Sequence, residues 1–194
     1  MRHAGLAVTL CALVAGSSHA AADTAATPVV AEVQTTLPAR KLAGTARLKV
    51  WGFQVYDASL WVAPRFRRDD YTAHAFALEL RYLRDFSAAA LARQSIEEIR
   101  RNSPAIDDAQ ALRWEGLLQA SFFDVKKGQR ITGIYQPASA GAAGPSATFV
   151  ADGLPATRIN DPELAKLFFG IWLSPNTSQP DMRRELLAGA DAPR

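Results

Sequence analysis

The chain has 194 residues, of which 48% are hydrophobic and 21% charged, and 22 Lys and Arg face 19 Asp and Glu. This composition is typical of a globular protein, and the length suits a single domain. The small net charge argues against a nucleic-acid-binding protein, because cations and acids are mixed along the sequence and no basic stripe forms.

Residues 1–22 have the pattern of a secretory signal peptide. Arg2 and His3 give a positive start, and residues 4–16 form an apolar run that is too short for a permanent membrane span. Small residues follow, so cleavage is expected near Ala20 to Ala22. We therefore predict a periplasmic or secreted protein whose mature chain has no transmembrane segment.

Cleavage at this point would remove Cys11, the single cysteine of the chain. The mature protein would then have no disulfide, no thiol nucleophile and no Cys-based zinc site. A medium-sized domain can be stable in the periplasm without such cross-links.

Residues 23–36 are predicted as a flexible lead-in with a possible edge strand, which we place at residues 29–37. Residues 37–190 are predicted as one domain. Its first element, residues 42–62, is expected to be a β-hairpin that turns at Trp51-Gly52, because alternating runs flank a glycine that tolerates positive φ. A turn centred there places Arg47 opposite Tyr56 on one face of the sheet, whereas a slip of one residue would send Tyr56 to the other face.

The remaining strands and helices follow in pairs. Alternating residues predict strands at 76–82, 130–136 and 147–151. A helix is expected at 88–101, with Ser87 as its N-cap.

A second helix is expected from residue 107 or 108 to about 122. Its predicted buried residues are Leu112, Leu117, Leu118 and Phe122. Asp161 and Pro162 begin a third helix with an almost wholly apolar body at 164–173, and a last helix spans about 179–188. This order of elements indicates an α+β fold with helices on an antiparallel sheet.

Residue types that carry catalysis are scarce. His74 is the only histidine that remains after cleavage, and we interpret it as a surface residue rather than part of a triad or a metal site. No glycine-rich phosphate loop is present. The acid pairs Asp69-Asp70 and Asp107-Asp108 are interpreted as loop and cap residues, so we predict no metal and no cofactor.

Arginine and aromatic side chains on the strands are the remaining candidates for a site. They are Arg47, Tyr56, Trp61, Arg81, Tyr82 and Arg84. A strand arginine beside aromatic residues needs a partner or the edge of a pocket. An apolar cavity with Arg47 and Tyr56 at its mouth would suit a carboxylate on a hydrophobic tail. Tyr82 and Trp61 complete the predicted ligand-binding set, although core packing is the simpler interpretation of Trp51 and Trp61.

The sequence also resembles the chalcone isomerase-like superfamily, in its bacterial exported branch. The hairpin at 42–62 is similar to the opening hairpin of that family, and residues 80–86, 123–131 and 168–178 agree with it. The most distinctive piece is Phe-Gly-Ile-Trp-Leu followed by proline, and the resemblance covers about residues 37–188. It implies an open-faced β-sandwich, a large antiparallel sheet with helices layered on one side.

Plant members of this family close a flavanone ring. Arg47 matches their hairpin arginine, but Tyr56 stands at their threonine position and Phe168 falls near their late hydroxyl. The helix at 88–101 offers neither their tyrosine nor its polar partner. The fatty-acid-binding relatives are more similar at the site, since they hold a carboxylate with an arginine and a tyrosine that correspond to Arg47 and Tyr56.

Three functions stay open on the sequence. The first is non-catalytic binding of a small amphipathic carboxylate, such as a fatty acid, in an apolar cleft. The second is an intramolecular lyase of the chalcone isomerase type, in which Arg47 would stabilise a developing oxyanion. The third is a protein-interaction module with a vestigial pocket. No nucleic-acid partner is expected, and the sequence gives no oligomeric state.

Overall fold

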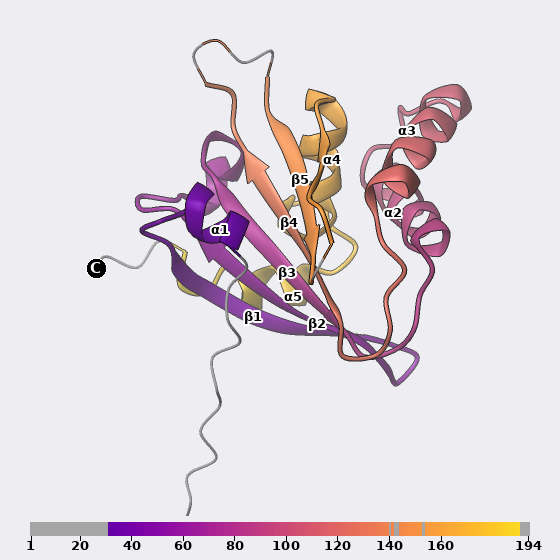
Figure 1. The fold of residues 1–194 in the computed structure, drawn as a ribbon, viewed down its shortest axis with the longest axis horizontal. Helices are drawn as coiled ribbons and strands as arrows, with labels where there is room; N and C mark the ends of the chain where they lie inside the picture. Colours follow the sequence, from indigo (N-terminus) through magenta and orange to yellow (C-terminus); the bar gives the residue numbers. More distant parts are fainter. Residues whose placement is uncertain (1–30, 140, 142–143, 153, 191–194) are drawn as a thin grey trace, which may run out of the picture.

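The structure is a computed structural model that describes residues 31–139, 141, 144–152 and 154–190. These residues form a six-stranded antiparallel sheet in which the strands follow one another in chain order (Figure 1). The strands are β1 (Lys41–Val50), β2 (Phe53–Val62), β3 (Phe76–Tyr82), β4 (Arg130–Gln136), β5 (Ser146–Ala151) and β6 (Thr157–Ile159). Each strand therefore pairs with its neighbours in the sequence, although the connection between β3 and β4 is long and contains two helices.

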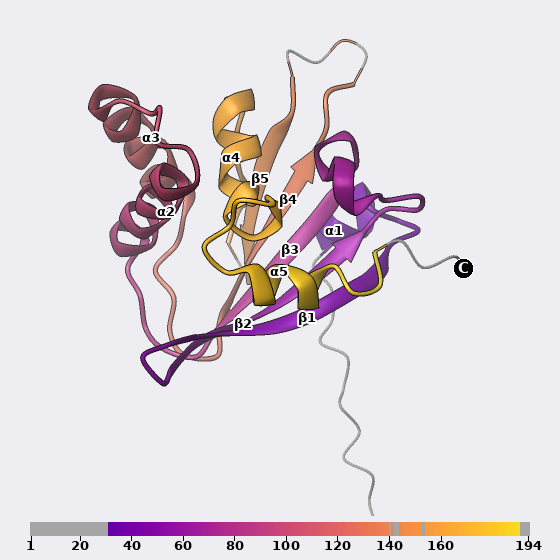
Figure 2. The same cartoon turned by 180° about the vertical axis from the view of Figure 1, so that it is seen from behind.

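Four helices lie on one side of this sheet. They are α2 (Ala88–Asn102), α3 (Asp108–Ser121), α4 (Pro162–Leu173) and α5 (Pro180–Leu186). Figure 2 shows α4 and α5 in front of the strands, with α2 and α3 beside them. The predicted α+β class, with helices layered on an antiparallel sheet, is confirmed.

Within the described part of the chain, the opposite face of the sheet carries one short helix, α1 (Ala31–Thr36). The edge strand predicted around these residues is wrong. Val33 and Leu37 are one helical turn apart, and both are buried against Ala77, Ile134 and Val150 of the sheet. Residues four apart share one face in a helix and in a strand alike, so this spacing does not distinguish the two, and the structure shows that the segment is helical. The predicted signal peptide at 1–22 lies outside the described residues.

The main core fills the space between the sheet and helices α2 to α5. Its centre is aromatic. The Phe168 and Phe169 rings of α4 pack on each other and on aromatic rings of the neighbouring strands, with ring centroids 5.0–5.6 Å apart. Gly133 on β4 makes room for this layer, because a Cβ there would lie 3.0 Å from the Phe169 ring. No helix among the residues with described positions is long and apolar enough to cross a membrane.

Helix α3 buries Leu118 as predicted, but it exposes two other leucines that were predicted to be buried. Its buried residues are Ala111, Trp114, Leu118 and Ser121, whereas Leu112 is 73% exposed and Leu117 is 40% exposed. The prediction followed the leucines, but the indole of Trp114 carries the largest apolar surface of this helix and sets its orientation. The helix at 88–101 and its Ser87 N-cap are confirmed, since the Ala90 N–H donates to Ser87 Oγ at 3.2 Å.

Asp161 joins two helices that are far apart in sequence. Its Oδ1 accepts the backbone N–H groups of Glu163 and Leu164, as predicted for the N-cap of α4. Its Oδ2 accepts the indole N–H of the buried Trp114 at 2.8 Å. One carboxylate therefore begins α4 and satisfies the only polar atom of the α3 core tryptophan.

We expect Asp161→Ala to lower the free energy of unfolding by about 3 kcal/mol, measured by urea denaturation. An N-cap contributes about 1 kcal/mol, and a buried N–H without a partner costs about 1–3 kcal/mol. Asp107→Ala is the matched control, because Asp107 caps α3 by accepting the Gln110 N–H and is otherwise exposed. It should cost only about 1 kcal/mol, and equal losses in the two variants would contradict the role of the Trp114 bond.

Candidate functional site

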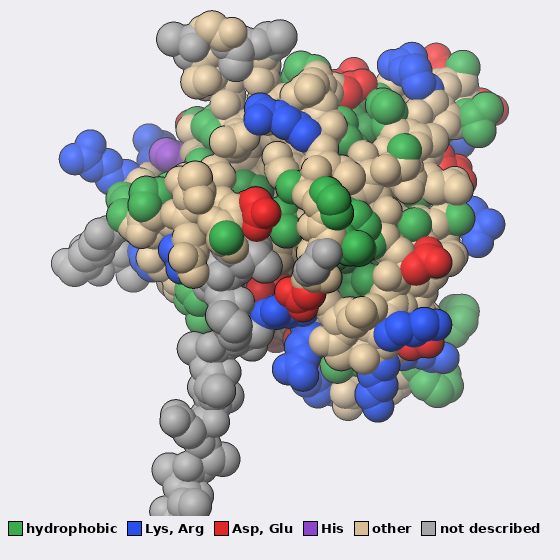
Figure 3. All heavy atoms as spheres, viewed as in Figure 1, with side chains coloured by type: hydrophobic (Ala, Val, Ile, Leu, Met, Phe, Trp, Pro, Cys, Tyr) green, Lys and Arg blue, Asp and Glu red, His purple; other side chains and the backbone are tan. Residues whose placement is uncertain are grey.

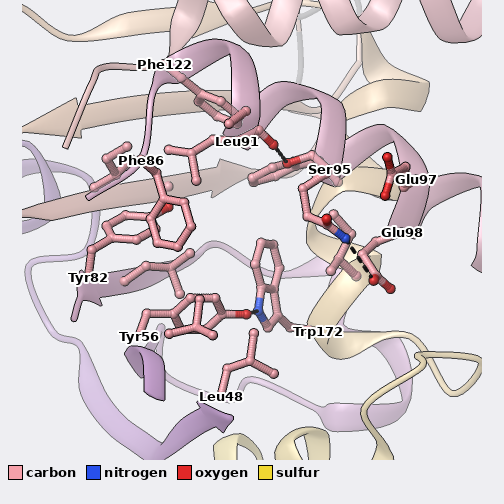
Figure 4. Close-up of a pocket in the computed structure, with 18 of the residues that line it drawn as sticks. Leu48, Tyr56, Tyr82, Phe86, Leu91, Ser95, Glu97, Glu98, Phe122 and Trp172 are labelled. Carbon is pink, nitrogen blue, oxygen red and sulfur yellow. Dashed lines mark hydrogen bonds between the residues drawn. The ribbon is translucent and has the colours of Figure 1, made fainter. Parts of the chain in front are cut away.

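A cavity of about 700 Å³ lies between the sheet and helices α2 and α4 (Figure 4). Strands β1 to β5 form its floor, and most of its lining is apolar. The apolar lining includes Leu48, Leu80, Phe86, Leu91, Phe122 and Phe168. Exposed charged side chains of the lining, Arg84, Arg93, Glu97 and Arg101, mark where the cavity opens to solvent. Its size falls within the range of about 300–1,000 Å³ that is usual for small-molecule sites.

The β1–β2 hairpin turns at Trp51-Gly52, as predicted, with φ of 49° and 83° at these two residues. The predicted register is wrong beyond Lys49. A β-bulge adds Val55 to β2, so Leu48 pairs with Tyr56 and Arg47 pairs with Asp57. Because neighbouring side chains on a strand alternate between faces, this single extra residue separates Arg47 from Tyr56.

Arg47 points away from the cavity and is held on the other face of the sheet. Its Nη2 donates to Asp57 Oδ2 at 2.9 Å, and its Nη1 donates to Gln54 Oε1 at 3.0 Å. The Nε also donates to Asp57, so the guanidinium fork is paired with one carboxylate. The expected anion site formed jointly by Arg47 and Tyr56 is therefore absent from the described structure.

Trp61 also lies on the far face, outside the cavity. It packs beside the small cluster under α1, where the Arg40 guanidinium sits 6.0 Å from the centre of its ring. Core packing is thus confirmed for Trp61. The same interpretation is wrong for Trp51, because its side chain is 94% exposed at the hairpin turn.

Tyr56 and Tyr82 are the predicted residues that the structure does bring together in the cavity. They pair across β2 and β3, and their rings meet edge to face with centroids 6.0 Å apart. The Tyr56 hydroxyl accepts the indole N–H of Trp172 on α4 at 2.9 Å, which leaves its own hydrogen free to donate. The Tyr82 hydroxyl has no hydrogen-bond partner among the described residues. The apolar cavity therefore contains two phenol groups that can each donate to a ligand.

Burial keeps both phenols neutral. Desolvation raises the pKa of Tyr56 and the pKa of Tyr82 far above the usual value of 10. Since the ionised form is the one that burial disfavours, these hydroxyls are donors at every physiological pH and are poor bases.

The chain has four tyrosines, and burial raises the pKa of each of them, to about 12 for Tyr135. The folded protein holds these protons more tightly than the unfolded chain does, so stability is retained below pH 10 and falls as the pH rises beyond it. We expect no tyrosinate absorbance to develop near pH 10 until the protein unfolds. A hydroxyl that titrates near pH 10 with the fold intact, as seen by circular dichroism, would contradict this burial.

Trp172 and Glu98 are site residues that the sequence prediction missed. Glu98 on α2 accepts Ser178 Oγ through Oε2 at 2.7 Å and Arg101 Nη1 through Oε1 at 2.6 Å. The Ser178 bond connects α2 to the segment after α4 at the side of the cavity where Trp172 meets Tyr56, whereas the Arg101 bond lies within α2 (Figure 4). The available signal was the indole itself, because a tryptophan in an otherwise apolar helix needs a partner for its N–H.

The described residues contain no cluster of three or more His, Cys, Asp or Glu that could hold a metal ion. The lining instead combines a large apolar surface with two neutral donors. This arrangement can sheath a hydrocarbon chain and hydrogen-bond one polar group on it.

Comparison with known proteins agrees with this architecture. No curated protein matches the chain. The fold is similar to the crystal structure of a fatty-acid binding protein from Arabidopsis thaliana, with a TM-score of 0.56 and 9% sequence identity over 79% of this chain and 89% of that one. A family model described as chalcone isomerase-like matches residues 21–188. The chain therefore belongs to the chalcone isomerase-like family.

Proposed function

We propose that this protein binds a small amphipathic acid, such as a fatty acid, in the cavity between the sheet and helices α2 and α4, without catalysis. The observation that carries the proposal is the pair of neutral phenol donors, Tyr56 and Tyr82, in a mostly apolar lining whose charged side chains lie at its opening. The fatty-acid binding protein with the same fold supports this ligand class. We also propose that the protein belongs to the exported bacterial branch of the family and acts in the periplasm, from the signal-peptide pattern at residues 1–22.

The hydrocarbon tail would supply most of the affinity. Each methylene moved from water into an apolar lining contributes about 0.8 kcal/mol, so burial of about ten methylenes gives roughly 8 kcal/mol before the costs of binding. The leucine and phenylalanine side chains around the cavity provide the surface for this burial. The polar head group then needs only hydrogen-bond partners, because burying it without partners would cancel much of the free energy gained from the tail.

The two phenols would satisfy the carboxyl group. Each hydroxyl can donate to one of its oxygens, and the geometry of Tyr56 is fixed by its bond from Trp172. Because both phenols stay neutral, they can bind a head group by donating hydrogen bonds to it, but they offer no positive charge for an ion pair. The lyase alternative relied on Arg47 at the reacting group, and Arg47 faces the other side of the sheet, paired with Asp57.

Native mass spectrometry of the protein purified from cell extract tests the ligand class, and displacement of a fluorescent fatty acid measures affinity. We expect Tyr82→Phe to weaken binding about tenfold, because one hydrogen bond contributes about 1–1.5 kcal/mol. Arg47→Ala is the matched control and should bind as the unchanged protein does.

Two results would overturn the proposal. One is that no acid co-purifies and no added fatty acid displaces the probe. The other is that Arg47→Ala loses binding while Tyr82→Phe keeps it, since the carboxyl group would then be held from the opposite face of the sheet.

A further inference from the structure

The turn between β1 and β2 carries three exposed apolar side chains. Val50, Trp51 and Phe53 are 41%, 94% and 61% exposed. The turn lies at the end of the sheet away from α1 (Figure 1), and Figure 3 shows hydrophobic side chains at this corner of the molecule beside several Lys and Arg. An isolated exposed leucine needs no explanation, but a cluster that includes the most exposed tryptophan of the chain does.

Neither packing nor backbone preference explains Trp51. Its φ is 49°, and Gly52 follows with φ of 83°, so both central residues of the turn are in the left-handed region. Asn-Gly is the favoured pair for such a turn, and a bulky residue with positive φ is strained. The indole therefore occupies a position that costs stability, and it makes no core contact in return. Strain of this kind is typical of functional positions.

The surroundings of the turn are mainly cationic. Lys49 precedes it on β1, and the Arg84 guanidinium lies 5.2 Å from the centre of the Phe53 ring. Lys126 and Lys127 are exposed in a neighbouring loop, where Asp85 accepts Lys126 Nζ at 3.1 Å and the Lys127 backbone N–H at 2.8 Å. The acids at this corner are Asp85 and the exposed Asp124, so positive charge predominates.

We propose that the β1–β2 turn docks the protein onto an anionic lipid bilayer. Trp51 and Phe53 would enter the interface between head groups and acyl chains, where aromatic side chains are enriched. Lys49, Arg84 and Lys127 would face the phosphate groups, since each cation near an anionic surface adds attraction. The turn is convex, a shape that fits the surface of a bilayer and does not offer a groove for a protein segment.

This surface adjoins the opening of the cavity. Val50, Trp51 and Arg84 belong both to the turn region and to the cavity lining. A docked protein would therefore present its cavity opening to the lipid. The docking itself is independent of what the cavity binds, so the two proposals can fail separately.

The test uses the mature chain with vesicles of phosphatidylcholine alone and of an equal mixture with phosphatidylglycerol. Trp114 and Trp172 are buried and Trp61 is half-buried, so a change in tryptophan emission reports mainly on Trp51. We expect a blue shift and co-sedimentation with the mixed vesicles, both weakened by salt. Little binding to phosphatidylcholine alone is expected.

Trp51→Asn should reduce co-sedimentation at least tenfold while Tm stays equal or rises, because asparagine suits the turn better. Phe53→Ser should also weaken binding and retains Trp51 as a reporter. Leu112→Ser is the matched control, since Leu112 is exposed on α3, far along the chain from the turn, and its loss should change nothing. Fatty-acid displacement without vesicles shows whether the cavity still binds in each variant.

Unchanged co-sedimentation of Trp51→Asn would overturn the proposal. Equal, salt-insensitive binding to both kinds of vesicle would do the same, because the cationic side chains would then have no role. Sedimentation velocity without lipid tests whether the turn instead binds a second copy of the chain. A dimer that Trp51→Asn abolishes would assign the turn to a second copy of this chain instead.

Discussion

Replacing Gly44 with valine is expected to lower the free energy of unfolding by about 3 kcal/mol or more, the upper range for overpacking a close contact. A Cβ at Gly44 would collide with the carbonyl oxygen of Glu185 and lie 2.6 Å from that of Leu186. Both atoms are backbone at the end of α5, so no rotamer change can relieve the clash. The strand and the helix would have to separate, which also breaks the 2.7 Å hydrogen bond from the Gly189 N–H to the Ala43 carbonyl.

Urea denaturation and Tm measure this loss, and a Tm drop of about 10 °C corresponds to it for a domain of this size. Gly116→Ala is the matched control. Gly116 lies in α3 with open space where its Cβ would be, and alanine there should stabilise the helix by about 0.5–1 kcal/mol. A Gly44→Val protein within 1 kcal/mol of the unchanged chain would show that α5 does not press on β1 as described.

Leu91→Trp is expected to reduce fatty-acid affinity about fiftyfold. Leu91 projects from α2 into the cavity (Figure 4), so a larger indole there occupies space that the hydrocarbon tail needs. Displacing about three methylenes costs about 2.4 kcal/mol, which is about fiftyfold in the dissociation constant. The effect should exceed that of Tyr82→Phe, because the tail contributes more to binding than one hydrogen bond does.

The loss should come without destabilisation, since added apolar volume fills empty space. Leu112→Trp provides the control, because it places the same new side chain on the exposed side of α3. It should leave the affinity unchanged. Unaltered affinity in Leu91→Trp, with Tm retained, would place the ligand somewhere other than this cavity.

The fold was largely predictable because its elements carry strong local signals. The strands alternate between apolar and polar residues, and the Asp161-Pro162 pair specifies the beginning of α4 through backbone chemistry alone. Helix α1 was not predictable in this way. A short segment with Val33 and Leu37 buried is compatible with a strand or with a helix, and only the surface offered by Ala77, Ile134 and Val150 decides between them.

The site was predicted in part, and the error has one cause. Tyr56 and Tyr82 were identified because they are aromatic side chains on predicted strands, and the family resemblance also pointed to Tyr56. Arg47 was misassigned because the count of residues on the two sides of Trp51-Gly52 does not reveal a bulge at Val55. A bulge depends on how β2 packs against both of its neighbours, which is tertiary information, and one extra residue reverses the face of everything beyond it.

The close packing of α5 on β1 also determines when folding can finish. Strand β1 is synthesised early and helix α5 late. Residues 185–189 nevertheless pack directly against residues 43 and 44. A nascent chain therefore cannot bury the inner surface of β1 until almost all of its residues are available. Under the export that we propose from the pattern at residues 1–22, this delay would keep the polypeptide unfolded while most of it is being made.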